Sequence, residues 1–210
     1  KIKIKELSSS GKVRVAVVGA GSFAVNTHLP NLSQAKNKFV IHTILDHKGA
    51  NAKNVADQFG AKYATTSFHE ILQDPEIDLV FITTRHDSHA SMVLQALKAG
   101  KHVLCEARMA RTAQEAQNML NTARLHSKQV AQIVPSPFTL SFDDSIKQLV
   151  ENGFFGQILS INGRFNFTHF LNGQSPMTWR ENADISGHNT MLMGIMYEAI
   201  ARWVGHASSV

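Results

Sequence analysis

The sequence predicts an α/β fold, in which a doubly wound parallel sheet is followed by a partial α+β second domain. Three observations predict it. Short apolar runs, such as residues 15–18, alternate with helical patterns as far as residue 134. These runs lack a polar–apolar alternation, which is typical of parallel strands buried on both faces. After Pro135-Ser136-Pro137 the patterns change in kind, so we expect a domain boundary there.

From the strand at 15–18 onward, the expected elements alternate between strand and helix. Strands are expected at 1–5, 15–18, 39–45, 62–64, 77–82, 101–106 and 130–134, and helices at 25–34, 51–59, 68–72, 87–98 and 113–126. Gly60 and Gly100 are typical of residues that end helices. Ser67 and Glu70 have the spacing of a capping box at the start of the helix at 68–72. Alternation with short turns favours a parallel sheet covered on both faces.

The predicted domain organisation has three parts. Residues 1–11 are interpreted as a linker or the end of a preceding domain, and residues 12–136 as a dinucleotide-binding domain. Residues 137–210 are expected to be the truncated start of a substrate or oligomerisation domain. The elements expected there are helices at 140–151 and 191–204 and a strand at 156–167.

A glycine-rich turn follows the strand at 15–18 and precedes a helical pattern. Gly19 permits a tight turn, Gly21 lets the backbone approach a pyrophosphate, and Ala24 lets the helix pack closely against the strand. With the intervening Ser22 and Phe23, this turn is predicted to bind the phosphates of a dinucleotide at the helix N-terminus. The strand and helix around the turn are the context that the motif requires, and they make the predicted sheet Rossmann-type.

Asp46 closes the second predicted strand, 25 residues beyond Gly21. A carboxylate near this spacing accepts hydrogen bonds from the adenosine ribose and repels a 2′-phosphate. It therefore favours NAD as the cofactor, while the nearby Lys48 leaves NADP open. The alternative is a nucleotide-free domain of the same fold, in which Asp46 only ends a strand.

The composition of the chain limits which binding partners and which cellular compartment we expect. The net charge of +5 is scattered, and no basic run with interleaved aromatics predicts nucleic-acid binding. We expect no membrane segment, because no apolar stretch approaches the ~20 residues that a span requires. The only cysteine, Cys105, cannot form an intrachain disulfide and is expected to act as a small buried hydrophobe; a cytoplasmic protein is predicted. No metal site is predicted, because His86 and His89 lack partner ligands.

The chain resembles the glucose–fructose oxidoreductase/inositol dehydrogenase/MocA (Gfo/Idh/MocA) family of nicotinamide-dependent oxidoreductases. The matching stretches are residues 19–24, His28-Leu29-Pro30, and residues 74–80, 83–89 and 99–106. The resemblance implies a homo-oligomeric enzyme whose substrate, often a sugar or polyol, binds between two domains. It also implies that the loops after the fourth and fifth strands of the dinucleotide-binding domain contact the nicotinamide side of the cofactor. The residues that this implication assigns to cofactor binding are Thr83, Thr84, Arg85, His89 and Glu106.

Two departures from the family pattern affect catalysis. The family's Glu-Lys-Pro reads Glu106-Ala107-Arg108, and the position of its later histidine falls on Met196, or on Tyr197 if the register slips by one. Oxidation of an alcohol needs a base, and a cation that lowers the pKa of the hydroxyl. As a hypothesis, Arg108 supplies the charge and Tyr197 relays the proton.

Two function classes follow from these residues. The first is an NAD(P)-dependent oxidoreductase acting on a sugar, polyol or related hydroxy compound, with altered catalytic residues. The second is a catalytically degenerate nucleotide-binding sensor or partner-binding module of the same fold. Retention of His89 and Glu106 favours the enzyme.

Overall fold

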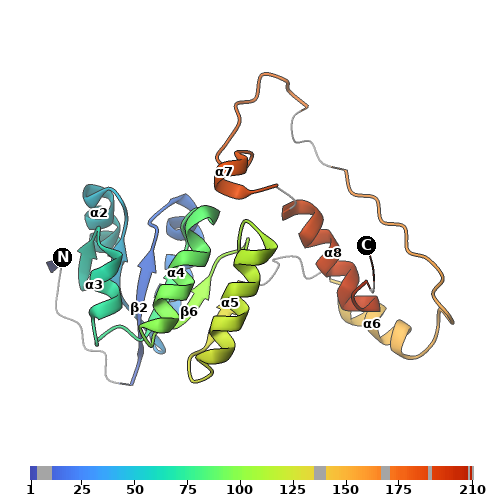
Figure 1. Ribbon diagram of the computed structural model, residues 1–210, viewed down its shortest axis with the longest axis horizontal. Helices are drawn as coiled ribbons and strands as arrows, with labels where there is room; N and C mark the ends of the chain where they lie inside the picture. The colour runs from blue at the N-terminus through green and yellow to red at the C-terminus, as the bar shows by residue number, and fades with distance from the viewer. Residues whose placement is uncertain (4–10, 135–140, 167–170, 189–190, 208, 210) are drawn as a thin grey trace. The chain divides into compact units, whose positions relative to one another are not determined.

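The computed structural model describes residues 1–3, 11–134, 141–166, 171–188, 191–207 and 209. They belong to two compact units, coloured along the chain in Figure 1. The first unit comprises Lys1–Val134 and Asp184–Gly187, and the second comprises Pro135–Ala183 and His188–Val210. Asp184–Gly187 thus belongs with the first unit although it lies about 50 residues further along the chain.

A seven-stranded sheet forms the centre of the first unit, in the order β1-β4-β3-β2-β5-β6-β7. Only β1 is antiparallel to its neighbour; the other pairs are parallel. The strands are β1 (Ile2–Lys3), β2 (Val13–Val18), β3 (Phe39–Leu45), β4 (Tyr63–Thr65), β5 (Leu79–Ile82), β6 (His102–Cys105) and β7 (Ala131–Ile133). The predicted α/β class with a Rossmann-type sheet is confirmed.

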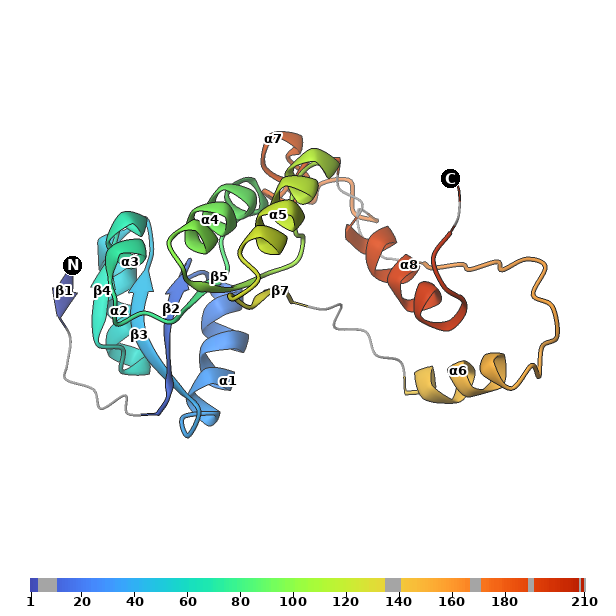
Figure 2. The same ribbon diagram turned by 60° about the horizontal axis from the view of Figure 1, so that its bottom comes forward.

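Helices cover both faces of this sheet, and Figure 2 shows α1 on the opposite side from α4 and α5. The helices of this unit are η1 (Ala24–His28, π-helical), α1 (Leu29–Gln34), α2 (Gly49–Phe59), α3 (Phe68–Gln73), α4 (His86–Lys98) and α5 (Ala113–Leu125). The short α7 (Ala183–Ser186) reaches this unit with its last residues. Gly60 ends α2 in the left-handed conformation, with φ +66°, as its place in the sequence predicts.

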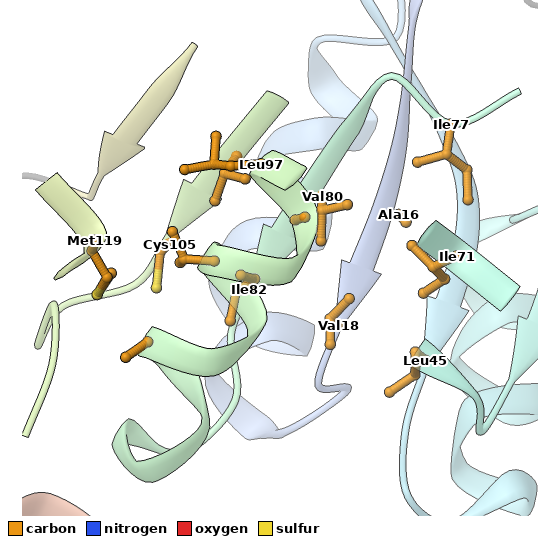
Figure 3. Packing of buried hydrophobic residues seen from close by; sticks show 14 of the residues in the cluster. Ala16, Val18, Leu45, Ile71, Ile77, Val80, Ile82, Leu97, Cys105 and Met119 are labelled. Carbon is orange, nitrogen blue, oxygen red and sulfur yellow. The ribbon is translucent and has the colours of Figure 1, made fainter. Parts of the chain in front are cut away.

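Side chains of β2 alternate between two buried clusters, one on each face of the sheet. Val15 and Val17 pack into a cluster with Leu29 and Val55, from α1 and α2. Ala16 and Val18 pack into the other cluster, drawn in Figure 3, which also contains the labelled Ile71, Leu97, Cys105 and Met119. Because successive side chains of a strand point to opposite faces, a strand with helices on both sides has to be apolar throughout.

The start of α3 differs from its prediction. Ser67 is the residue before the helix, but its side chain makes no capping hydrogen bond. The side chain of Thr65 makes the hydrogen bonds at this helix start instead: its hydroxyl accepts the N–H of Ser67 at 3.0 Å and donates to the Glu70 carboxylate. Thr65 lies at the end of β4, so the strand and not the helix start sets the position of Glu70.

The second unit contains α6 (Asp143–Glu151) and α8 (Met191–Val204). The indole N–H of Trp203 donates to Asp143 at 2.8 Å, and this bond joins the two helices. The strand predicted at 156–167 is wrong for its described part, since none of residues 156–166 forms a strand. Leu159 is 85% exposed there: without a paired neighbour, alternation alone does not make a strand. Leu140, which opens the helix predicted at 140–151, and Phe167, which closes the strand predicted at 156–167, lie outside the described residues.

In the part of the chain that the structure describes, none of the helices has the length and the apolar composition of a membrane span.

Candidate functional site

The candidate site lies where the order of strands in the sheet reverses. From β2 the chain proceeds through β3 and β4 toward one edge, and it then returns to place β5 on the other side of β2. Sheets of this kind bind ligands beyond the carboxyl ends of their strands at such a switch point. The loops that follow β2 and β5, with the neighbouring loops after β3 and β6, therefore define the site.

Gly19 makes the tight turn after β2. Its φ of +100° is a backbone conformation that side chains rarely allow, and an added Cβ would lie 3.0 Å from the backbone of Thr83. The Thr83 hydroxyl donates to the carbonyl of Gly19 at 2.6 Å and to that of Val18 at 3.0 Å. The loops after β2 and β5 are thereby held together, and only glycine fits between them.

Gly21 lies at the open side of the same turn. A Cβ built on it would meet nothing within 4 Å, and its φ is not in the left-handed range. Space beside the backbone is what a bound pyrophosphate would need there. Ala24 is buried, as expected where the following helix packs closely, while Phe23 is about half exposed and Ser22 accepts a hydrogen bond from Asn26 at 3.1 Å.

Asp46 follows β3, and its buried carboxylate lies against the glycine turn. One oxygen accepts the N–H of Ala20 at 3.3 Å and the side-chain amide of Asn51 at 3.0 Å; the other accepts the N–H of Lys48 at 2.9 Å. Asn51 also donates to the carbonyl of Ala20 at 3.0 Å. Sequence reasoning missed Asn51, although its place in the first turn of the helix after Asp46 is a signal that could have found it.

The loop after β5 contains Thr83, Thr84 and Arg85, and α4 begins directly after them. The hydroxyl of Thr84 bonds to that of Ser88 at 2.6 Å, and Arg85 is exposed. His89 is fully buried, with Nδ1 2.7 Å from the carbonyl oxygen of Arg108 and Nε2 3.1 Å from that of Thr84. His89 thus connects the loops after β5 and β6.

Glu106 follows β6, and its carboxylate contacts His28 at the end of η1. The other oxygen of the carboxylate accepts the N–H of Ala107 at 3.0 Å. The imidazole of His28 also packs against two rings, with centroids 4.9 Å from Phe23 and 4.7 Å from Phe81. Sequence reasoning gave His28 no role, although the His28-Leu29-Pro30 stretch was part of the family resemblance.

Arg108 holds the segment Asp184–Gly187, which belongs to this unit. Its guanidinium donates to the carbonyl of the fully buried Ser186 at 2.6 Å, and burial lowers the pKa of Arg108. Arg111 donates to the carbonyl of Asp184 at 2.9 Å. Gly187 has φ +66°, and a Cβ there would lie 2.6 Å from the carbonyl oxygen of Arg111, so only glycine allows this close approach.

Two further residues of the sequence analysis are placed by the structure. Tyr197 belongs to the second unit, where its hydroxyl accepts the N–H of Ala207 at 2.9 Å. Cys105 is fully buried, and desolvation raises the pKa of its thiol to about 12. A thiol of this kind is not a nucleophile at neutral pH, as the sequence analysis expects.

One group of three side chains that could hold a metal ion is found in the described part of the chain: His42, Asp74 and Glu76, whose ligand atoms lie within 4.8 Å of one another. The ammonium of Lys62 lies 2.8 Å from Glu76, and that of Lys1 contacts Asp74. Both carboxylates therefore already bind a cation.

Comparison with known proteins agrees with this geometry. A family model described as the oxidoreductase family with an NAD-binding Rossmann fold (GFO_IDH_MocA) matches residues 13–133. Levoglucosan dehydrogenase of Pseudarthrobacter phenanthrenivorans is 30% identical over 141 residues, which cover 67% of this chain and 36% of that protein. Inositol 2-dehydrogenase of Salmonella typhimurium is 25% identical over 156 residues, 72% of this chain and 45% of that protein.

Solved structures of the same fold are also similar. A levoglucosan dehydrogenase in complex with NADH and L-sorbose superposes with a TM-score of 0.76 at 24% identity, covering 93% of this chain and 53% of that one. An NAD-binding oxidoreductase from Klebsiella pneumoniae has a TM-score of 0.77 at 22% identity, covering 93% and 54%. The chain spans about a third to just over half of the length of these relatives. By its sequence from residue 13 to residue 133, the chain belongs to the Gfo/Idh/MocA family of oxidoreductases with an NAD-binding Rossmann fold.

Proposed function

We propose that this chain forms the cofactor-binding part of an NAD(P)-dependent oxidoreductase that acts on a sugar, polyol or related hydroxy compound by hydride transfer. The observation that carries the proposal is the position of Asp46, whose carboxylate bonds to the N–H of Ala20 in the glycine turn. A carboxylate bonded to the phosphate-binding turn is suitably placed for the ribose of a dinucleotide.

The residues around the switch point suit such a cofactor. The open space beside Gly21 would admit the pyrophosphate, with Gly19, Ser22, Phe23 and Ala24 around it. Asp46 would hold the adenosine ribose, and its charge would disfavour a 2′-phosphate, so NAD is the proposed cofactor and NADP the alternative. Thr83, Thr84, Arg85 and Glu106 would line the nicotinamide side. When bound, the nicotinamide ring supplies the acceptor or donor of the hydride.

Two residues that contact backbone carbonyl groups would hold the loops of the site in place. His89, between the carbonyl oxygens of Thr84 and Arg108, would hold the two nicotinamide-side loops at a fixed distance. Arg108 would hold Ser186 and supply positive charge beside the site. The proton relay assigned to Tyr197 stays a prediction, because this residue lies in the second unit.

The substrate class is proposed from the relatives. Levoglucosan dehydrogenase and inositol 2-dehydrogenase are named for compounds with several hydroxyl groups. We infer that this protein, like these two relatives, oxidises or reduces such a compound, and that it does so as a homo-oligomer.

The proposal is tested by measuring cofactor binding and turnover separately. Titration with NADH and NADPH, followed by nicotinamide fluorescence, should show binding with a preference for NADH. Incubation with NAD and levoglucosan, L-sorbose or myo-inositol should then produce NADH absorbance at 340 nm. Failure to bind either cofactor would contradict the proposal. Binding without turnover would favour the second candidate.

The second candidate is a nucleotide-binding sensor or partner-binding module without catalysis. Two residues favour it specifically: Ala107 and Met196 stand where the resemblance expects a lysine and a histidine. The double variant Ala107→Lys with Met196→His separates the candidates. Turnover that appears only in this variant supports the sensor, whereas turnover in the unmodified protein supports the enzyme.

A further inference from the structure

The polar side chains at the site differ in how much freedom their contacts leave them. Asp46 accepts three hydrogen bonds, two of them from the backbone, and His89 is fully buried between two carbonyl oxygens. Arg108 is a cation that donates to a backbone carbonyl. His28 and Glu106 differ from all three, because their side chains contact each other. A carboxylate in contact with an imidazole can take up a proton and share it with its partner.

The contacts of Glu106 hold its carboxylate in one orientation. One oxygen bonds to the N–H of Ala107 at 3.0 Å, and the other faces Nε2 of His28. The side chains of Glu106 and His28 are 13% and 12% exposed, so the pair is mostly buried but still reaches solvent. The rings of Phe23 and Phe81 fix the imidazole from the sides. A base that is held in this way loses little entropy when it reacts.

The pair lies next to position 107, where the family resemblance expects a lysine. Position 107, directly after Glu106, holds alanine, which cannot accept a proton. An alcohol that loses a hydride must also lose its hydroxyl proton, and carboxylates and imidazoles are the side chains that most often accept it. Both members of a Glu–His pair have an atom that can bind a proton, so the pair can accept one proton and release it again.

We propose that Glu106 accepts the hydroxyl proton of the substrate and that His28 positions Glu106 and shares this proton. This inference rests on the proposed function. In the oxidation, the substrate O–H bond breaks and its proton passes to the Glu106–His28 pair. The carbinol C–H bond breaks with its electron pair leaving as a hydride to the nicotinamide of NAD(P), and a carbonyl group forms. One proton and one hydride leave the substrate, so the step is balanced.

Variants of Glu106 test the role of the proton acceptor. Glu106→Gln keeps the size of the side chain and an acceptor for the N–H of Ala107, but it cannot take up a proton. We expect kcat to fall about a hundredfold or more, with NADH affinity changed less than threefold. In Glu106→Ala, added formate should restore part of kcat, since a small carboxylate can occupy the vacated space. The control is Glu151→Gln, an exposed glutamate of the second unit, which should behave as the unmodified protein.

Variants of His28 test the role of the positioning residue. His28→Gln keeps a donor for Glu106 and should retain more of kcat than His28→Leu, whereas KM should change little in either. The contact itself is read without turnover by ¹⁵N-detected NMR of the imidazole. The His28 signals should change in Glu106→Gln and stay unchanged in Glu151→Gln.

The outcomes separate this inference from the proposed function. Turnover in the unmodified protein that persists undiminished in Glu106→Gln overturns the inference and leaves the proposed function intact. An unmodified protein that binds NADH but turns over none of levoglucosan, L-sorbose and myo-inositol overturns both. Turnover that is lost in Glu106→Gln and restored by formate in Glu106→Ala supports both.

Discussion

The two ends of the parallel sheet use charged side chains differently. At the amino ends of the strands, charges pair with one another: Arg14 at the start of β2 bonds to Asp78 through both its guanidinium, at 2.7 and 2.9 Å, and its backbone N–H, at 2.8 Å. At the carboxyl ends, Asp46 and Glu106 accept N–H groups of the loop backbone. At the amino end the Asp78 carboxylate is thus paired with a cation, whereas at the carboxyl end the carboxylates also orient the backbone of the loops.

The pKa shifts of two carboxyl groups at the amino end agree with a stabilising role for their ion pairs. Hydrogen bonding to Arg14 lowers the pKa of Asp78, and hydrogen bonding to Lys62 lowers the pKa of Glu76. Lys101 is buried there, its ammonium donating to the carbonyls of Asp74 and Ile77 at 2.5 and 2.9 Å, and desolvation lowers its pKa. We therefore expect substitutions at the amino end to change stability, and substitutions at or beside the glycine turn at the carboxyl end to change cofactor binding.

Lys101→Met should give the largest loss of stability. It leaves the carbonyls of Asp74 and Ile77 without their donor in a buried position, which costs about 3 kcal/mol of the free energy of unfolding. Urea denaturation followed by circular dichroism measures this loss. Lys98→Met, at an exposed position of α4, is the matched control and should change the free energy by less than about 0.5 kcal/mol. Equal stability of both variants would contradict the proposed difference between the ends.

Gly21→Val should have the opposite effect: it should leave stability nearly unchanged and weaken NADH binding. The added side chain meets no protein atom within 4 Å of its Cβ, so the free energy of unfolding should stay nearly unchanged. The same side chain would fill the space proposed for the pyrophosphate, and NADH affinity should fall about a hundredfold, or about 2.7 kcal/mol. Fluorescence titration measures the affinity. Gly173→Val, at a similarly open glycine of the second unit, should bind NADH normally. Normal binding by Gly21→Val would show that the turn does not contact phosphate.

Asp78→Asn tests the stabilising role of the charges at the amino end through the dependence of stability on pH. The pKa of Asp78 is lowered in the folded protein, so the ionised carboxylate contributes stability above its unfolded pKa of about 3.9. This contribution is lost as the pH falls through the folded pKa. The variant should be less stable by about 1 kcal/mol at pH 7, since the pair is partly exposed, and should lose less stability on acidification. Parallel curves of stability against pH for the variant and the unmodified protein would contradict this account.

Asp46→Ala tests the carboxyl end of the sheet through the choice of cofactor. Loss of the Asp46 carboxylate should weaken NADH binding about tenfold, or about 1.4 kcal/mol. It should weaken NADPH binding less, because the repulsion of a 2′-phosphate is removed. Paired titrations with the two cofactors give the ratio of affinities. Asp57→Ala, at an exposed position of α2, should leave that ratio unchanged. An unchanged ratio in Asp46→Ala as well would mean that Asp46 does not face the ribose.

The sequence alone determined the features that depend on neighbouring residues. The run Val15–Val18 is apolar on both faces, and all four residues are fully buried in β2. The ranges of β3 and α8 were also predictable, because the spacing of apolar residues and the residues that end each element lie within the segment itself. The same local logic identified the glycine turn and Asp46, which the structure brings together at the switch point.

Only the tertiary structure decided which distant residues meet. His28 and Glu106 are 78 residues apart, and no local pattern pairs them. Thr65 replaced Ser67 at the start of α3, because the end of β4 delivers a hydroxyl that outcompetes the cap. The strand predicted at 156–167 did not form in its described part, since a strand requires a partner that its own sequence does not supply. Backbone periodicity is a property of the segment, whereas pairing and side-chain partners depend on the whole fold.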